Sequence, residues 1–255
     1  MSEIIQTGDS RPSQVSSGIA YDKRHNHHKQ RVLLGSILWV LVILTFVGLA
    51  FFAHAHRQPT PFELSFSKDV QSIGFPIWIT STFRFLTFIN DPRPDEIEVP
   101  TVLILFLLFR WFWQAAFLAL SVGIGNGVDA LVGDVVGRPR PRPDVIHVDS
   151  KLIFNSFPSG HSCHMMVFYG FLLYLTFTQP VRQSRYRLLV IPFQIWAMLN
   201  ILVVGFARIW EGEHWITDVI GGYLDGIIWL TLFIFLYNLT MQKVHEHRAK
   251  KLALQ

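Results

Sequence analysis

Long apolar runs alternate with short polar segments along this chain, and their lengths predict membrane-spanning helices. The first run, residues 32–53, contains no charged side chain and has about the length that the hydrocarbon core of a bilayer requires. Five further, mostly apolar runs follow, at residues 96–110, 115–136, 161–177, 188–206 and 218–239. We therefore expect an all-α polytopic membrane bundle with about six transmembrane helices.

The polar segments around these runs divide the chain. Phe75 to Ile89 mixes aromatic side chains with Arg84, which predicts an interfacial helix after the first span. Residues 1–31 are polar and end in a basic cluster, so we expect a disordered basic tail there. The membrane domain is expected at residues 32–241, and a second basic tail at residues 242–255.

Composition supports a membrane protein and argues against an ordinary soluble domain. Hydrophobic residues make up 51% of the chain, whereas only 16% of its residues are charged. The formal net charge of +4 could indicate a nucleic-acid partner, but the basic residues mostly flank the apolar runs. Such flanking charges set membrane topology, so we expect no nucleic-acid partner. The single cysteine, Cys163, excludes an internal disulfide.

The distribution of basic residues predicts an orientation. With six spans, the N-terminal tail, the loop at residues 179–187 and the C-terminal tail lie on one side, and all three are rich in Lys and Arg. Positive loops favour the cytoplasm, so residues 137–161 and 207–218 fall on the other side. The arginines of the former oppose this trend, and anion binding would explain them. We expect a plasma-membrane protein with cytoplasmic termini and an outer, periplasmic or lumenal site.

The segment Asn155–His161 predicts an anion-binding turn at the start of a helix. Pro158 fixes a backbone angle, and Gly160 lets the backbone approach a ligand closely. Ser159 is a candidate N-cap, which leaves free N–H groups at the helix start beside His161. This arrangement suits a phosphate group.

A second polar segment, residues 207–218, supplies complementary chemistry. His214 and Asp218 are four residues apart, so on a helix they share one face. A carboxylate beside an imidazole fixes its tautomer and raises its basicity. Arg208 provides a planar cation suited to phosphate. An anion cradle, two histidines, an orienting carboxylate and several arginines together indicate phosphoryl transfer without a metal or a cofactor.

Three motifs in order along the chain give it a family resemblance. The residues that carry them are Arg140-Pro141, Pro158-Ser159-Gly160-His161, and Arg208 with His214 and Asp218. They are similar to the patterns Lys-x6-Arg-Pro, Pro-Ser-Gly-His and Ser-Arg-x5-His-x3-Asp, with Ala207 in place of the serine. Residues 96–238 thereby resemble the type 2 phosphatidic acid phosphatase superfamily, the lipid phosphate phosphatases whose relatives include vanadium haloperoxidases.

The resemblance implies a metal-independent phosphatase that forms a phosphohistidine and hydrolyses a phosphate monoester or pyrophosphate of a membrane lipid. His214 would be the nucleophile, Asp218 would orient it, and His161 would protonate the leaving oxygen. The groups that would bind phosphoryl oxygens are Arg140, Arg208 and the backbone of Ser159 and Gly160. Preorganised donors of this kind stabilise the charge that develops on those oxygens during transfer.

The chain departs from the family pattern at Gly133, which stands where the first motif has lysine. Arg138 or Arg142 could replace that cation, because each precedes a proline and is biased toward extended backbone. In a β-like segment both would face the same side as Arg140, whereas in a polyproline helix the three would fan out. Two alternative functions stay open: a lipid phospho-headgroup transferase, and a non-catalytic phospholipid-binding or transport relative.

Three acidic residues outside the motifs have two interpretations each. Asp129 lies within the predicted span at residues 115–136 and is expected to make a structural hydrogen bond, with a catalytic role as the alternative. Glu211 and Glu213 are expected to be solvated loop charges, with substrate contact as the alternative.

Overall fold

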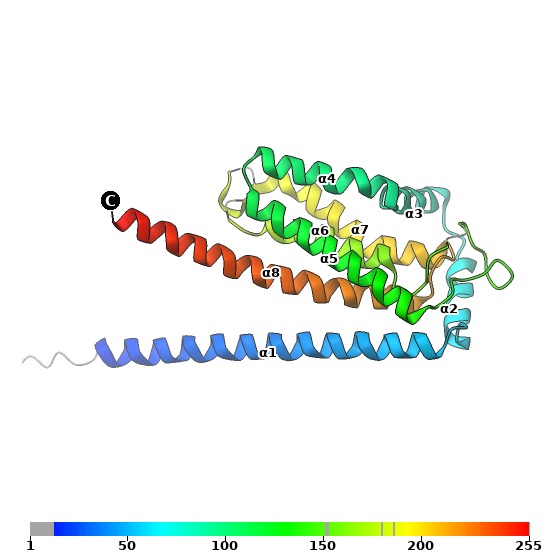
Figure 1. Cartoon of the computed structure of the whole chain (residues 1–255), viewed down its shortest axis with the longest axis horizontal. Helices are drawn as coiled ribbons and strands as arrows, with labels where there is room; N and C mark the ends of the chain where they lie inside the picture. Colours follow the sequence, from blue (N-terminus) through cyan, green and yellow to red (C-terminus); the bar gives the residue numbers. More distant parts are fainter. Residues whose placement is uncertain (1–12, 151–152, 180, 186, 255) are drawn as a thin grey trace, which may run out of the picture. The chain divides into compact units, whose positions relative to one another are not determined.

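The computed structural model describes residues 13–254 except 151–152, 180 and 186, and every regular element in these residues is a helix. The elements are α1 (Ser13–Ala55), α2 (Pro61–Ser72), α3 (Ile77–Ile89), α4 (Pro92–Leu108), α5 (Phe112–Val136), α6 (Gly160–Thr176), η1 (Val181–Gln183), η2 (Arg187–Val190), α7 (Ile191–Trp210) and α8 (Ile216–Ala253). The chain forms two units, residues 1–41 and residues 42–255. The expected all-α class is confirmed (Figure 1).

Each of the six predicted spans corresponds to a helix, namely α1, α4, α5, α6, α7 and α8. Four described segments are long and apolar enough to cross a membrane: Val32–Ala55, Phe112–Val136, Arg187–Trp210 and Ile216–Ala253. Helices α4 and α6 have 17 residues each, which corresponds to about 26 Å at the usual rise per residue. This length falls slightly short of a hydrocarbon core of about 30 Å.

The N-terminal part of the described chain differs from the expected disordered tail, and most of the expected basic C-terminal tail is helical. Helix α1 begins at Ser13 and α8 continues to Ala253, so residues 13–31 and 242–253 are helical. Neither segment contains proline, and Gly18 is the single glycine in them. Because each adjoins a long apolar helix, every added residue extends an existing helix and needs no new nucleus. The remaining part of the N-terminal prediction, residues 1–12, lies outside the described residues.

Between the first two spans the chain forms two short helices, of which α3 matches the predicted interfacial helix. The other, α2, begins with a capping box. The Thr60 side chain accepts a hydrogen bond from the Glu63 backbone, and the Glu63 side chain accepts one from the Thr60 backbone. This reciprocal pair stabilises the first turn of α2. It also directs Glu63 inward, where it is buried.

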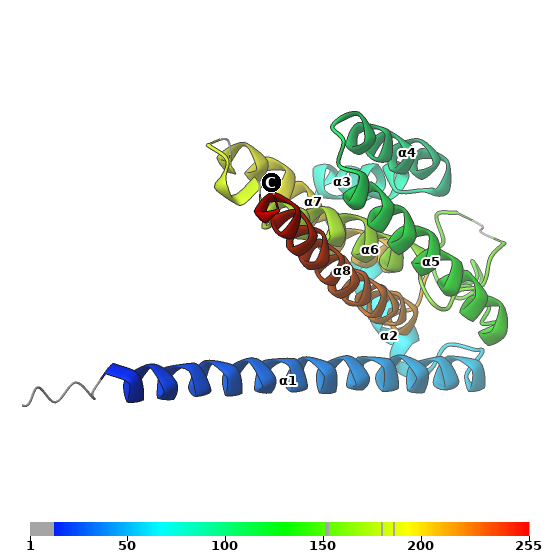
Figure 2. The same ribbon diagram turned by 60° about the vertical axis from the view of Figure 1, so that its left-hand side comes forward.

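Helix α6 lies at the centre of the second unit, with α5, α7 and α8 packed around it (Figures 1 and 2). Its core side chains include Met165, Phe168 and Phe171, which are fully buried. Gly222 lets α8 approach the start of α6 closely, because a Cβ atom there would lie 2.3 Å from the carbonyl oxygen of Ser159. The core therefore holds the start of α6 against the first turns of α8, where the two expected site segments meet.

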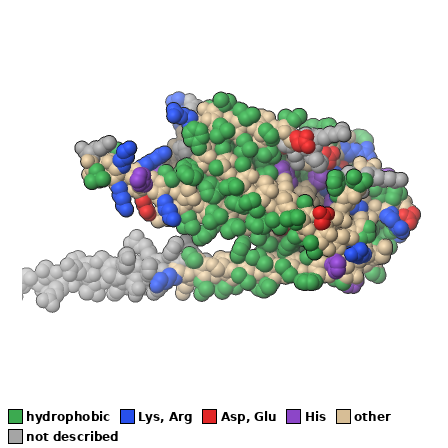
Figure 3. Space-filling view, viewed as in Figure 1, with side chains coloured by type: hydrophobic (Ala, Val, Ile, Leu, Met, Phe, Trp, Pro, Cys, Tyr) green, Lys and Arg blue, Asp and Glu red, His purple; other side chains and the backbone are tan. Residues whose placement is uncertain are grey.

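The surface of the second unit is apolar along the helices and charged at their ends. Figure 3 shows hydrophobic side chains over the flank and most of the coloured charged side chains gathered at the two ends. Leu202 on α7 and Val135 on α5 remain 63% and 78% exposed. Apolar surface on this scale is unfavourable in water and favourable in lipid. The chain is therefore an integral membrane protein.

Candidate functional site

Backbone hydrogen bonds bring the two expected site segments together. The N–H group of Ser159 donates to the carbonyl oxygen of Asp218 at 3.0 Å, which joins the start of α6 to α8. The N–H group of His214 donates to the carbonyl oxygen of Arg208 at 3.3 Å, so the turn after α7 folds back on its last helical residues. Ser159 is the N-cap of α6, as expected, but its side chain makes no capping hydrogen bond. His161 and His214 are thus held on one continuous framework.

The hydrogen bonds of His214 determine its tautomer. Its Nδ1 lies 2.8 Å from the carbonyl oxygen of Ser156, and because a carbonyl only accepts, Nδ1 must carry the proton. Its Nε2 then presents a lone pair, which accepts a hydrogen bond from Arg140 Nη1 at 3.1 Å. Burial, and then the positive charges of Arg140 and Arg208, hold the pKa of His214 well below its usual range. At neutral pH the imidazole is therefore uncharged.

Asp218 contacts His214 less directly than the spacing suggested. Its Oδ2 lies 4.0 Å from His214 Nδ1, beyond hydrogen-bond distance. Instead the hydroxyl of Ser156 donates to Asp218 Oδ2 at 2.6 Å, while the carbonyl of the same serine accepts from the imidazole. Ser156 therefore links the carboxylate to the histidine. Sequence reasoning missed this serine, although it lies only two residues before Pro158.

His161, the second histidine, pairs with a carboxylate from the start of α4. Its Nε2 lies 3.1 Å from Asp91 Oδ1, and the same oxygen is 3.8 Å from Arg208 Nη2. Burial acts to raise the pKa of Asp91, but the hydrogen bond to His161 and the charge of Arg208 outweigh it, and the pKa is lowered. Asp91 is thus an ionised partner for His161. None of the sequence motifs includes Asp91.

Glu211 and Glu213 correct the expectation of solvated loop charges, because both are buried. Gly212 between them adopts a φ of 71°, a left-handed conformation that glycine permits. This sharp turn folds the segment over Arg208, which forms ion pairs with both glutamates, the one to Glu211 at 3.3 Å. Burial raises the pKa of Glu211 to about 7, even though Arg208 and a hydrogen bond from Thr87 oppose the rise. The cation expected to bind phosphate thus already has carboxylate partners.

Arg138, Arg140 and Arg142 have separate partners, as expected for the fanned-out alternative. Arg138 is fully buried and binds Glu63 and Asp218. Arg142 is exposed and pairs with Asp144 at 3.0 Å. Arg140 alone among the three lines a cavity of about 700 Å³. A phosphate-binding role for Arg138 or Arg142 stays a prediction, but their observed contacts do not favour it.

The cavity that contains Arg140 also holds several other expected groups. Gly160, His161 and Asp129 line it, as does Gly133, the position where the family motif has lysine. Arg208 lies instead on a second cavity of about 420 Å³, together with Asp91 and Glu213. The expected phosphate ligands are therefore divided between two cavities. Asp91 connects them, because it lines the second and contacts His161 of the first.

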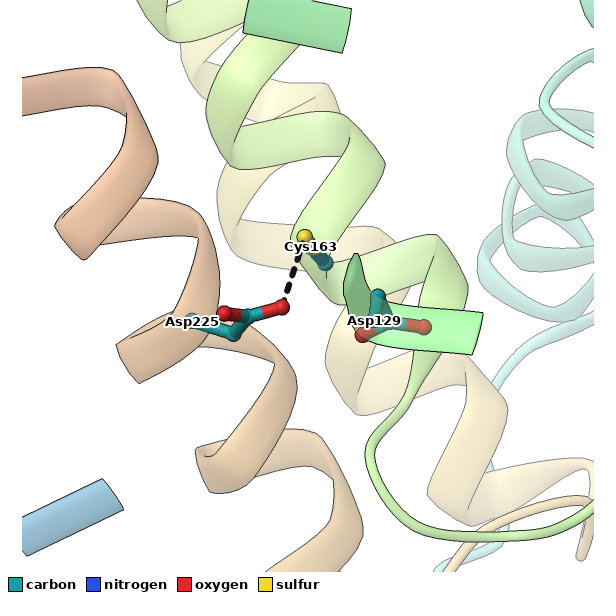
Figure 4. A group of neighbouring side chains, drawn as sticks. All are labelled: Asp129, Cys163 and Asp225. Carbon is teal, nitrogen blue, oxygen red and sulfur yellow. Dashed lines mark hydrogen bonds between the residues drawn. The ribbon is translucent and has the colours of Figure 1, made fainter. Parts of the chain in front are cut away.

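Three buried side chains converge from α5, α6 and α8 (Figure 4), and one of them, Asp129, also lines the first cavity. One ligand atom each of Asp129, Cys163 and Asp225 lies within 4.8 Å of the other two. The thiol of Cys163 donates to Asp225 Oδ2 at 3.5 Å, and the indole of Trp229 donates to Asp225 Oδ1 at 3.0 Å. Both oxygens of Asp225 thus already accept hydrogen bonds, and the cluster forms a polar contact between helices.

The chain is similar to a known protein family and to known phosphatases. The family model of the PAP2 superfamily matches residues 111–242. Phosphatidylglycerophosphatase B of Bacillus subtilis (strain 168) is 25% identical over 215 residues, which cover 83% of this chain and 98% of that protein. Lipid A 1-phosphatase of Rhizobium johnstonii is 30% identical over 129 residues, which cover 47% of this chain and 46% of that protein.

Two solved structures share the fold. The crystal structure of a transmembrane PAP2-type phosphatidylglycerolphosphate phosphatase from Bacillus subtilis matches with a TM-score of 0.65 and 22% identity, covering 81% of this chain and 96% of that chain. The crystal structure of Aquifex aeolicus LpxE matches with a TM-score of 0.53 and 18% identity, covering 69% of this chain and 96% of that chain. At these identities the structures support the fold alone.

Proposed function

Since this chain belongs to the PAP2 superfamily, we propose that it is an integral-membrane phosphatase that hydrolyses a phosphate monoester or pyrophosphate of a lipid. The observation that carries the proposal is the uncharged imidazole of His214, whose Nε2 lone pair accepts a hydrogen bond from Arg140. Arg140 lines the same cavity as His161, whereas His214 itself is fully buried. The relatives named for their activity are phosphatases of phosphatidylglycerophosphate and lipid A. A phosphorylated lipid is the substrate class common to both.

In the proposed reaction, Nε2 of His214 attacks phosphorus while the bond from phosphorus to the leaving oxygen breaks. His161 donates a proton to that oxygen, and the carboxylate of Asp91, 3.1 Å from its Nε2, favours the protonated imidazole that this step requires. Water then attacks the phosphohistidine, with His161 accepting its proton, and free phosphate leaves. Arg140 and the free N–H groups at the start of α6 stabilise the phosphoryl oxygens. These steps use the histidine pair as nucleophile and as acid and base.

The contacts of the two histidines favour this reaction over a purely binding role. A binding site needs only cations and N–H groups, whereas here each imidazole has its own oxygen partner, Asp91 or Ser156. Partners of this kind set the protonation state that catalysis requires. Transfer of a phospho-headgroup to the hydroxyl of another lipid is the second candidate, because it would use the same histidine nucleophile with an acceptor hydroxyl in place of water.

The assay of purified protein in detergent tests the function. Phosphate release is expected from at least one of phosphatidic acid, phosphatidylglycerophosphate and undecaprenyl pyrophosphate, and it should persist in chelator because the donors named above neutralise the phosphate. Orthovanadate should inhibit, since it mimics the five-coordinate phosphoryl centre. Absence of release from all three lipids, or a rate restored only by added divalent metal, would contradict the proposed mechanism.

The charge distribution of the second unit supports the proposed orientation. Basic residues of the loop after α6 include Arg182 and Arg187, and those of the end of α8 include Lys243, Arg248 and Lys251. Helix α6 begins at the site, at Gly160, and ends next to that basic loop, so the site and the loop lie at opposite ends of this helix. By the positive-inside rule the basic end is cytoplasmic. The proposed site then opens on the outer side of the plasma membrane.

Cysteine labelling checks this orientation. In a Cys163→Ser background, Asp144→Cys should react with a membrane-impermeant maleimide in intact cells or spheroplasts. Gln183→Cys should react only after permeabilisation. Both positions are exposed, so access depends on the side of the membrane. The opposite pattern would invert the topology.

A further inference from the structure

We propose that Glu63 is a positioning residue that acts through Arg138 and keeps the negative charge of Asp218 available to His214. This inference rests on the proposed function, because it concerns the nucleophile of that reaction. It gives a role to α2, which lies outside the matched residues 111–242. Glu63, Arg138 and Asp218 form a buried chain of charges.

Arg138 joins the two carboxylates directly. Its Nη2 donates to both oxygens of Glu63 at 2.8 Å, and its Nη1 donates to Asp218 Oδ1 at 2.8 Å. The side chains of Glu63, Arg138 and Asp218 are all at most 1% exposed. Solvent and salt therefore screen these charges little. Each carboxylate is paired, which is what buried charges require.

Glu63 is held in place independently of Arg138. The backbone N–H and the hydroxyl of Thr60 donate to its Oε2 at 2.8 and 2.9 Å. The hydroxyl of Thr217, one residue before Asp218, also donates to Glu63 and accepts from Arg138 Nη1 at 2.7 Å. Burial acts to raise the pKa of Glu63, but the hydrogen bonds from Thr217, Thr60 and Arg138 outweigh it and lower the pKa. The residue is therefore ionised.

The net charge of Glu63, Arg138 and Asp218 together affects His214. Two carboxylates and one guanidinium sum to one negative charge, and Asp218 presents that charge 4.0 Å from His214 Nδ1. Without Glu63, Arg138 and Asp218 would sum to zero. The imidazole ring becomes positively charged as Nε2 bonds to phosphorus, so it gains from a nearby net negative charge. Glu63 thus offsets the cation that would otherwise neutralise Asp218.

The test compares kcat and KM for wild type, Glu63→Gln and the double variant Glu63→Gln/Arg138→Met, with phosphatidic acid or whichever lipid the wild type hydrolyses. Glu63→Gln keeps the shape of the side chain and is expected to lower kcat about 10- to 100-fold, less than the loss of an orienting carboxylate costs elsewhere. KM should change less than about threefold, because the variant leaves the cavity intact. The double variant restores one net negative charge and should recover part of the lost kcat.

Two control variants separate charge from packing. Asp69→Asn removes an exposed carboxylate from the same helix and should leave kcat unchanged. Thr217→Val removes the hydrogen bonds of Thr217 to Glu63 and Arg138 but keeps the charges of Glu63, Arg138 and Asp218, so kcat should fall less than in Glu63→Gln. Thermal unfolding in detergent is measured for every variant, so that a fall in kcat is compared only among folded proteins.

The outcomes are distinct. An inactive wild type contradicts the proposed function itself. With an active wild type, normal kcat in Glu63→Gln overturns the role of Glu63. The proposal is also overturned if the double variant has a lower kcat than Glu63→Gln, or if Thr217→Val has a kcat as low as that of Glu63→Gln. Either result would mean that the Glu63–Arg138–Asp218 contacts support the structure without an effect of charge. If Glu63→Gln does not fold, Thr217→Val carries the comparison, and a kcat more than 10-fold below wild type contradicts the charge argument.

Discussion

Replacing His214 by alanine is expected to lower phosphate release by more than about 10³-fold, as removal of a nucleophile does elsewhere. The residue is fully buried between Ser156 and Arg140, and alanine puts no nucleophilic group in its place. The variant should also form no phosphoenzyme. The measurement uses ³²P-labelled substrate and an alkaline quench, because a phosphohistidine survives base and not acid.

The matched comparison is His161→Ala, which keeps the nucleophile. It should still form phosphoenzyme from a nitrophenyl phosphate, whose leaving group needs no proton, while release from a lipid substrate falls. His147→Ala, in an exposed loop position, should behave as wild type. Labelled protein in the His214→Ala variant would show that another residue is the nucleophile.

The second large effect is expected from Gly222→Ala, a substitution that touches no reacting group. A Cβ atom at this position would lie 2.3 Å from the carbonyl oxygen of Ser159 and 2.9 Å from Cβ of Ser162. Backbone cannot move aside as a flexible side chain can, so α8 must shift away from the start of α6. Overpacking of this kind costs about 1–3 kcal/mol, and the displacement also separates the groups of the site.

We expect Gly222→Ala to lower the temperature of half-inactivation in detergent and to reduce kcat at least about 100-fold, since small misplacements cost about that much. Gly123→Ala on α5 is the control, because a Cβ atom there meets nothing within 4 Å. Alanine favours helix over glycine by up to about 1 kcal/mol, so this variant should be as stable as wild type or more so. Equal behaviour of the two variants would contradict the close approach of α6 and α8.

The sequence predicted the helices well because their signal is local. A bilayer requires long apolar runs, and these are visible in a window of some twenty residues. The prediction failed at residues 13–31, where a polar segment continues the helix begun by its apolar neighbour. Polarity indicates where a helix leaves the membrane, but it does not end the helix without a proline, a glycine or a cap.

The site was predicted only in part, because motifs identify residues and not their partners. Spacing within one segment related His214 to Asp218, yet the contacting oxygen belongs to Ser156. Asp91, which pairs with His161, lies 70 residues away in the sequence, and Glu63 lies 75 residues from Arg138. No local pattern relates such distant segments. Glu211 and Glu213 were misjudged for a similar reason, since a charge in a short loop is solvated only if the loop faces water.

The hydrogen bond from Arg140 to His214 makes the proposed nucleophile conditional on its substrate. Arg140 stays charged, although burial and then Arg208 lower its pKa to about 10, and its guanidinium occupies the lone pair that attack requires. An anion that enters the cavity competes for that guanidinium. The Nε2 lone pair of His214 is therefore released when a phosphate group binds beside it. A neutral triester in the same cavity would offer Arg140 no charge, so the hydrogen bond from Arg140 to His214 would remain and the lone pair would stay blocked. In the proposed reaction, selectivity for charged esters would then be expressed in reactivity as well as in affinity.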